Sequence, residues 1–139
     1  MAVRHASAVW QGTLREGHGN MQFGTFEGPY TFASRFEEGA GTNPEELIGA
    51  AHAGCYSMAL SGSLVRAGFT PVRIQTQATV NLGTVDGKSR ITRIDLACQA
   101  EVPGITPEAF MKIAEETKSG CPVSAALAAI EITLQARLI

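Results

Sequence analysis

The chain has 139 residues, a formal net charge of -2 and 17% charged residues, against about 25% in an average soluble domain. This length suits one domain, 1–139, with its own core, and the small net charge gives no electrostatic reason to expect nucleic acid or an anionic membrane as a partner. Three cysteines without a C-x-x-C pair exclude a disulfide scaffold and give no zinc-site spacing.

The N-terminal part, 1–41, is predicted to be an antiparallel meander of three strands followed by a loop. Apolar and polar residues alternate over 7–14, 21–26 and 30–36, and glycine-containing turns at 17–20 and 28–29 separate these segments. The third strand carries Arg35 near its end. The glycine-rich segment 37–41 then leads to the next element and is the only predicted boundary in the chain.

The segment 42–66 is predicted to be a long central helix. Asn43 is a good N-cap, Pro44 fits the first helical position, and Glu46 stands at the spacing of a capping box with Asn43. The interior is small or apolar almost all round, so we expect a buried helix. Three glycines interrupt it: Gly49, Gly54 and Gly62. Each costs about 1 kcal/mol against alanine, which indicates the close approach of another backbone.

After the central helix, the rest of the part 42–139 is predicted to form a hairpin, two helices and a closing strand. Alternating strands over 72–82 and 91–102 flank the turn dipeptide Asp86-Gly87. A helix is expected over 106–120, a short helix from Cys121-Pro122 to 129, and a last strand over 130–138. This order of elements is typical of the α+β class.

Cys121 and Cys55 are the candidate nucleophiles. Cys121 stands at a helix N-terminus, where free amides and the helix dipole lower the pKa of a thiol; the alternative is a small apolar cap residue. Cys55 lies inside the apolar helix, where inert packing is the alternative. Because burial raises the pKa of a thiol, Cys55 needs a nearby cation to become a thiolate. Arg35 is the candidate, although it can equally be a solvated charge at the end of a strand.

Glu45 is free to hold an arginine, since Glu46 has the capping position; Glu45 can also simply complement the helix dipole. Ten residues of helix separate Glu45 from Cys55, which is about 15 Å. One chain therefore does not easily place this carboxylate beside this thiol, whereas two antiparallel copies of the helix can. We therefore expect a site shared in a dimer.

The other candidate side chains carry weaker signals. Cys98 shares a face with apolar residues of a predicted strand and is expected in the core. His52, three residues before Cys55, can be a base or half of a metal site, but a packed or interfacial histidine fits the pattern better. No phosphate loop, G-x-S-x-G elbow or H-E-x-x-H motif is present, which excludes nucleotide, esterase and zinc-protease readings.

Three segments, SRFEEGAGT (34–42), NPEELIGAAHAGCYSMAL (43–60) and CPVSAAL (121–127), closely resemble the osmotically inducible protein C family, which is grouped with the organic hydroperoxide resistance proteins. The resemblance implies a thiol peroxidase of organic hydroperoxides, less active on hydrogen peroxide. It assigns the peroxidatic role to Cys55, the resolving role to Cys121, activation of the thiol to Arg35 and positioning of that arginine to Glu45. It also implies an intertwined homodimer, with strongly curved antiparallel sheets wrapped around long buried central helices.

No bound cofactor or metal is required by this chemistry, and an external dithiol, either a lipoylated protein or a thioredoxin-like donor, would reopen the disulfide. The cytoplasm is the expected location, with no membrane segment. Two other functions are open: a redox-sensing or ligand-binding dimer that uses the cysteine pair without turnover, and a structural dimerisation domain with inert cysteines. Local electrostatics alone gives Cys121 the lower pKa, whereas the resemblance gives the first attack to Cys55.

Overall fold

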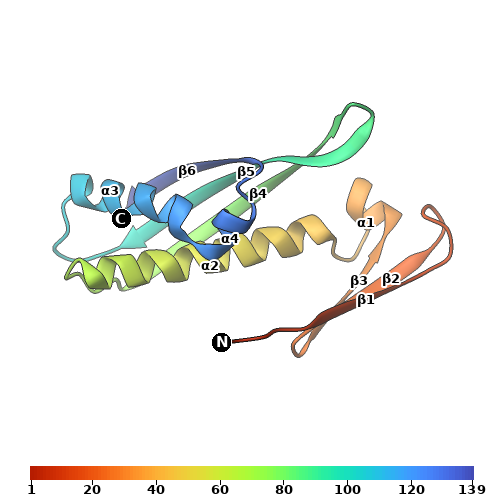
Figure 1. Ribbon diagram of the computed structural model, residues 1–139, viewed down its shortest axis with the longest axis horizontal. Coiled ribbons are helices and arrows are strands. Elements are labelled where there is room, and N and C mark those ends of the chain that lie inside the picture. Colours follow the sequence, from red (N-terminus) through yellow and green to blue (C-terminus); the bar gives the residue numbers. More distant parts are fainter. The chain divides into compact units, whose positions relative to one another are not determined.

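The computed structural model describes residues 1–139 as two compact units, 1–47 and 48–139 (Figure 1). The first unit contains strands β1 (Ala6–Gln11), β2 (His18–Phe23) and β3 (Phe26–Thr31), helix α1 (Phe32–Phe36) and the start of α2 (Pro44–Arg66). The second contains the rest of α2, then β4 (Arg73–Val85), β5 (Lys88–Glu101), α3 (Pro107–Gly120), α4 (Pro122–Ala126) and β6 (Glu131–Leu138). The division falls in the first turn of α2, shortly after the loop where the sequence predicted a boundary.

The first unit is the predicted meander, ordered β1-β2-β3, but its second turn lies elsewhere than expected. Phe23 pairs with Phe26 across Gly24 and Thr25, and Gly24 has a φ of +59°, which favours glycine. The predicted turn at 28–29 is instead inside β3, where Pro29 pairs with Asn20. Since β3 is an edge strand, the missing amide of Pro29 is tolerated there.

The prediction of a strand over 30–36 was wrong beyond Thr31, because a local cap starts helix α1. The Thr31 hydroxyl accepts from the Ser34 amide at 3.1 Å, and Ser34 Oγ accepts from the Thr31 amide at 2.9 Å. This reciprocal capping box outweighs the alternating pattern. Phe32 and Phe36, four residues apart, pack with tilted rings whose centroids are 4.9 Å apart, so their spacing serves the helix equally well.

Helix α2 begins as predicted, since Asn43 Oδ1 accepts from the Glu46 amide at 2.8 Å. The Glu46 carboxylate accepts from the Thr42 hydroxyl at 2.9 Å, so only half of the expected capping box forms. Helix α2 is also not buried all round in the single chain. One side is buried, through His52, Tyr56, Leu60 and Leu64. The opposite side, through Ala50, Ala51, Gly54, Met58 and Val65, is exposed.

The second sheet has the order β4-β5-β6. The predicted hairpin is confirmed: Asp86 and Gly87 have φ of 51° and 73° and close antiparallel β4 and β5. Strand β6, however, runs parallel to β5, which corrects the expectation of a purely antiparallel sheet. The chain returns to the sheet through α3 and α4, a connection long enough to bring a strand back in the same direction.

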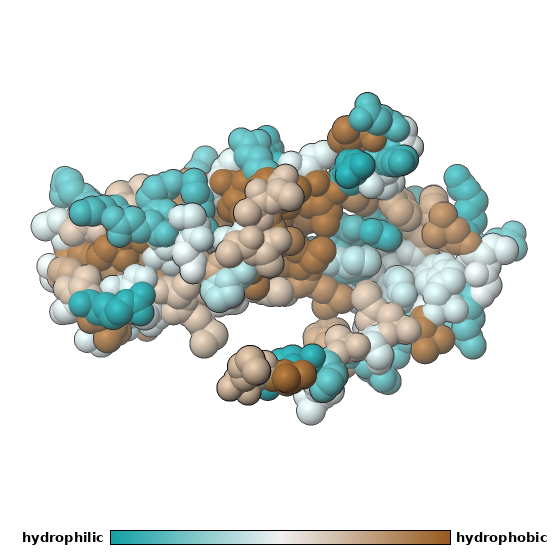
Figure 2. Space-filling view, in the orientation of Figure 1, coloured by the Kyte–Doolittle hydropathy of each residue, from teal (hydrophilic) through white to brown (hydrophobic).

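The core of the second unit lies between this sheet and the helices. Ile94, Leu96, Cys98 and Ala100 project from alternate positions of β5 and are at most 2% exposed. Tyr56 is fully buried and donates through its hydroxyl to the Ala114 carbonyl at 2.9 Å, which ties α2 to α3. Figure 2 shows a mainly apolar surface around α4. None of the helices has the combined length and apolar character that crossing a bilayer requires.

Candidate thiol site

Cys55 and Cys121, 66 residues apart in the sequence, are brought together in the second unit. Cys55 lies half-buried near the middle of α2, and Cys121 is fully buried between α3 and α4. Each thiol affects the pKa of the other, and the Val123 amide lowers the pKa of both. None of the three cysteines of the chain forms a disulfide. Two neighbouring thiols are the arrangement that a reversible disulfide needs.

Cys121 is fixed by the two helices that meet there. Its amide donates to the Thr117 carbonyl at 3.2 Å and ends α3, and its sulfur accepts from the Ser124 amide at 3.3 Å as the N-cap of α4. Pro122 occupies the first position of α4, where its missing amide has no consequence. The predicted N-cap position of Cys121 is therefore present, although α4 ends at Ala126 and not at 129.

The surroundings push the pKa values of the two thiols in opposite directions. Burial raises the pKa of Cys55, and Cys121 raises it further, while only the Val123 amide lowers it. Burial also works against ionisation of Cys121, but hydrogen bonds with the Ser124 hydroxyl and amide, together with Cys55 and the Val123 amide, outweigh it and lower the pKa of Cys121. The local electrostatic expectation therefore holds, with Ser124 as its main cause.

Arg35 and Glu45 form an ion pair in the first unit. Arg35 donates through Nη2 to Glu45 Oε1 at 2.7 Å and through Nε to both carboxylate oxygens at 3.2 Å. Glu45 is 7% exposed, while the Arg35 side chain is 36% exposed. The guanidinium carbon also lies 5.2 Å from the centre of the Phe36 ring. Such a fork geometry holds a guanidinium in one orientation while leaving part of it open.

His52 and Ser124 extend the thiol pair in a way the sequence analysis did not predict. His52 is fully buried, as expected for a packed histidine, and its Nε2 lies 2.7 Å from Ser124 Oγ. Ser124 Oγ lies 3.1 Å from Cys121 Sγ. No group of three or more metal-binding side chains forms in the chain, so His52 is not part of a metal cluster. The serine three residues after an N-capping cysteine was the available signal for Ser124.

Comparison with known proteins places the chain in a family. Residues 37–135 match the family described as OsmC-like protein. The chain is also 49% identical over 138 residues to Peroxiredoxin OsmC of Escherichia coli K12, covering 97% of this chain and 96% of that protein. The chain belongs to the OsmC-like family. The OsmC protein of Shigella flexneri matches to the same extent.

Solved structures of OsmC-like proteins have the same fold. An OsmC-like protein from Mycoplasma pneumoniae matches with a TM-score of 0.78 at 16% identity, over 99% of this chain and 98% of that one. The organic hydroperoxide resistance protein OhrB of Bacillus subtilis matches with a TM-score of 0.69 at 21% identity, over 99% and 100% of the two chains. These likenesses establish the fold: α+β, with two three-stranded sheets and four helices.

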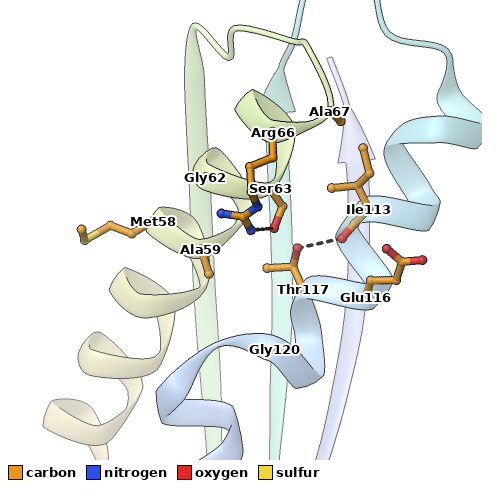
Figure 3. Close-up of a pocket in the computed structure, with 10 residues that line it drawn as sticks. All are labelled: Met58, Ala59, Gly62, Ser63, Arg66, Ala67, Ile113, Glu116, Thr117 and Gly120. Atoms are coloured by element: carbon orange, nitrogen blue, oxygen red, sulfur yellow. Dashed lines mark hydrogen bonds between the residues drawn. The ribbon is translucent and has the colours of Figure 1, made fainter.

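Two pockets of this OsmC-like chain differ in their chemistry. A pocket of about 420 Å³ in the first unit is walled by aromatic rings beside Arg35: Trp10, Tyr30, Phe32 and Phe36. A larger pocket, about 610 Å³, lies between the C-terminal turns of α2 and α3 (Figure 3). Two of its polar side chains have partners within the chain, since Arg66 donates to Ser63 and Thr117 donates to the Ile113 carbonyl. Neither thiol lines this second pocket.

Cys98 takes no part in the thiol pair. It is 2% exposed on β5, and burial raises the pKa of its thiol. The prediction of a core cysteine is confirmed.

Proposed function

We propose that this chain is a cysteine-based peroxidase that reduces organic hydroperoxides, and hydrogen peroxide less well, with Cys55 as the peroxidatic and Cys121 as the resolving cysteine. The observation that carries the proposal is that these two free thiols lie near enough to affect each other's pKa, inside a fold shared with OsmC-like and organic hydroperoxide resistance proteins. The Escherichia coli relative is named a peroxiredoxin, and the Bacillus subtilis and Legionella pneumophila structures are named organic hydroperoxide resistance proteins.

The reaction follows from thiol chemistry. The Cys55 thiolate attacks one peroxide oxygen and the O–O bond breaks; the leaving alkoxide takes a proton and departs as an alcohol, and Cys55 is left as a sulfenic acid. The Cys121 thiolate then attacks the sulfenic sulfur, which forms the S–S bond and releases hydroxide as water. An external dithiol reduces the disulfide by two exchange steps and becomes a disulfide itself. The donor is a lipoylated or thioredoxin-like dithiol, and the cytoplasm is the compartment that suits it.

Arg35 is the cation that lets Cys55 ionise, and Glu45 holds that arginine in place. In the single chain the influences on the pKa of Cys55 are burial, the Val123 amide and Cys121, and none of them is a cation. A guanidinium beside the sulfur would lower its pKa and stabilise the charge that develops on the leaving oxygen. The aromatic pocket beside Arg35 suits the organic group of a hydroperoxide.

The site is completed in a homodimer, through the exposed side of α2. The glycines of α2 support this. A Cβ at Gly49 would lie 3.2 Å from Val80 Cγ2, so packing on β4 explains that glycine. A Cβ at Gly54 would meet nothing within 4 Å, so nothing in the single chain explains its cost. An antiparallel copy of α2 against Gly54 and Met58 would explain both the glycine and the exposed methionine, which is 79% exposed.

Gly54→Ala distinguishes a solvent-exposed face of α2 from a face that packs against a partner helix. On a solvent-exposed helix face the substitution would stabilise the fold by about 1 kcal/mol. Against a partner helix the added methyl group opens the interface, so we expect a weaker dimer by sedimentation at micromolar concentration. Gly49→Ala is the matched control, since its added methyl group would meet Val80 within the same chain and is expected to leave the dimer in place. A monomer with the native sequence at all concentrations would contradict the proposed dimer.

The function is tested by following the consumption of cumene hydroperoxide with dihydrolipoamide as the electron donor. We expect sustained turnover, many equivalents per chain, and a lower kcat/KM with hydrogen peroxide. The redox-sensing alternative predicts consumption of a single equivalent. Inert cysteines predict no consumption and slow alkylation of both thiols at neutral pH.

A further inference from the structure

Three buried side chains from two elements of the second unit form an unbroken polar chain that ends at the resolving sulfur. His52 of α2 is fully buried, and its Nε2 lies 2.7 Å from the Oγ of Ser124 in α4. Ser124 is 3% exposed, and its Oγ lies 3.1 Å from Cys121 Sγ while its amide lies 3.3 Å from the same sulfur. The peroxidase chemistry proposed above does not use His52.

The other ring nitrogen of His52, Nδ1, decides which way the hydrogen bonds from His52 through Ser124 to Cys121 run. Nδ1 is buried and has no hydrogen-bond partner. Burial lowers the pKa of His52, so the ring is neutral and carries one N–H. A proton on Nδ1 would be a buried donor without an acceptor, and orphaned buried N–H groups are rarer than orphaned acceptors. The proton therefore belongs on Nε2, where it points at Ser124 Oγ.

The direction of the Ser124 hydroxyl follows from this tautomer. Because Ser124 Oγ accepts from His52, its own proton is free to point to the sulfur. In the protonated thiol, Cys121 can donate to Ser124 Oγ; once the thiol ionises, the hydroxyl and the amide of Ser124 both donate to the sulfur. Hydrogen bonds in such a series strengthen each other, and those to a charged atom are the stronger ones.

We propose that His52 is a positioning residue for Cys121: as a neutral imidazole protonated on Nε2, it holds the Ser124 hydroxyl in the orientation that stabilises the Cys121 thiolate. That the Cys121 thiolate attacks the sulfenic acid of Cys55 rests on the proposed function. That Ser124 and His52 stabilise this thiolate does not rest on it. The titratable groups that influence or adjoin Cys121 are Cys55 and Tyr56, both from α2. Neither is a cation that could replace the hydroxyl.

The proposal is tested on the only thiol left in a Cys55→Ser, Cys98→Ser background, by titrating the ultraviolet absorbance of the Cys121 thiolate. We expect His52→Leu and Ser124→Ala to raise the pKa of Cys121 by about one unit, a tenfold smaller thiolate fraction below the pKa. His52→Gln keeps an N–H donor near the Nε2 position and is expected to restore most of the shift. In the native chain, the ¹⁵N shifts of the His52 ring are expected to show a proton on Nε2 and none on Nδ1.

Two results would overturn the proposal: an Nδ1–H tautomer of His52, or folded His52→Leu and Ser124→Ala proteins whose Cys121 pKa is unchanged. If His52→Leu does not fold, Ser124→Ala and the tautomer of the native chain still decide. A second readout is the lifetime of the Cys55 sulfenic acid, trapped with dimedone, which is expected to lengthen about tenfold in His52→Leu. If no sulfenic acid forms in the native chain, the peroxidase function fails, while the titration still tests His52.

Discussion

Cys55→Ser is expected to reduce hydroperoxide turnover by on the order of 10³-fold or more, because removing a nucleophile leaves no route to the covalent intermediate. Turnover of cumene hydroperoxide with dihydrolipoamide measures this loss. Cys98→Ala is the matched control, since this buried cysteine lies on β5 outside the thiol pair and its loss is expected to leave turnover in place. Undiminished turnover in Cys55→Ser would exchange the roles of the two cysteines.

Cys121→Ser separates the two steps. We expect this variant to reduce one equivalent of hydroperoxide and then to accumulate the Cys55 sulfenic acid, which dimedone or mass spectrometry detects. The comparison matters because the single chain favours the thiolate at Cys121: the pKa of Cys121 is lowered while that of Cys55 is raised. Attack by Cys55 therefore requires a change in its surroundings, which is the role proposed for Arg35.

The sequence predicted best the elements whose signals are local and repeated. The start of α2 follows from Asn43, and the β4–β5 hairpin follows from Asp86-Gly87 with alternating flanks. The segment 32–36 was predicted wrongly, because Phe32, Ser34 and Phe36 satisfy the alternation of a strand while Thr31 and Ser34 cap a helix. The direction of β6 depends on where α3 and α4 return the chain to the sheet, which no local pattern reports.

In the candidate site, too, the features with a local sequence signal were predicted and those that depend on the fold were not. The N-cap position of Cys121 was readable from Cys121-Pro122. The capping position of Glu46 left Glu45 free to hold an arginine, and the family resemblance implied that this arginine is Arg35, with which Glu45 forms an ion pair. The proximity of Cys55 and Cys121 was expected from the family resemblance, since a separation of 66 positions in the sequence gives no local signal. The link from His52 to Ser124 joins α2 to α4 and required the folded chain.

Arg35→Ala is expected to lower kcat/KM for organic hydroperoxides by about 10²- to 10³-fold, the range for removing one group that stabilises developing charge. It is also expected to move the pH profile of sulfenic acid formation to higher pH. Without the guanidinium the already raised pKa of Cys55 is no longer opposed, so less thiolate exists at any pH below that pKa. The loss is therefore largest at low pH and shrinks as the pH approaches the pKa of Cys55. Stopped-flow oxidation over a pH series measures both effects.

The partner variants test the geometry of the ion pair. Arg35→Lys keeps the charge but loses the fork that holds Nε and Nη2 on Glu45, so an intermediate rate is expected. Glu45→Gln keeps the size of the side chain and frees the guanidinium, which should weaken the rate less than Arg35→Ala. Arg93→Ala is the control, because it removes another arginine–carboxylate pair, in which Arg93 lies 2.9 Å from Asp95 on β5.

A full rate and an unshifted pH profile in Arg35→Ala would mean that another cation ionises Cys55. Arg15, whose guanidinium lies 4.7 Å from the centre of the Phe32 ring, would then be the next residue to replace.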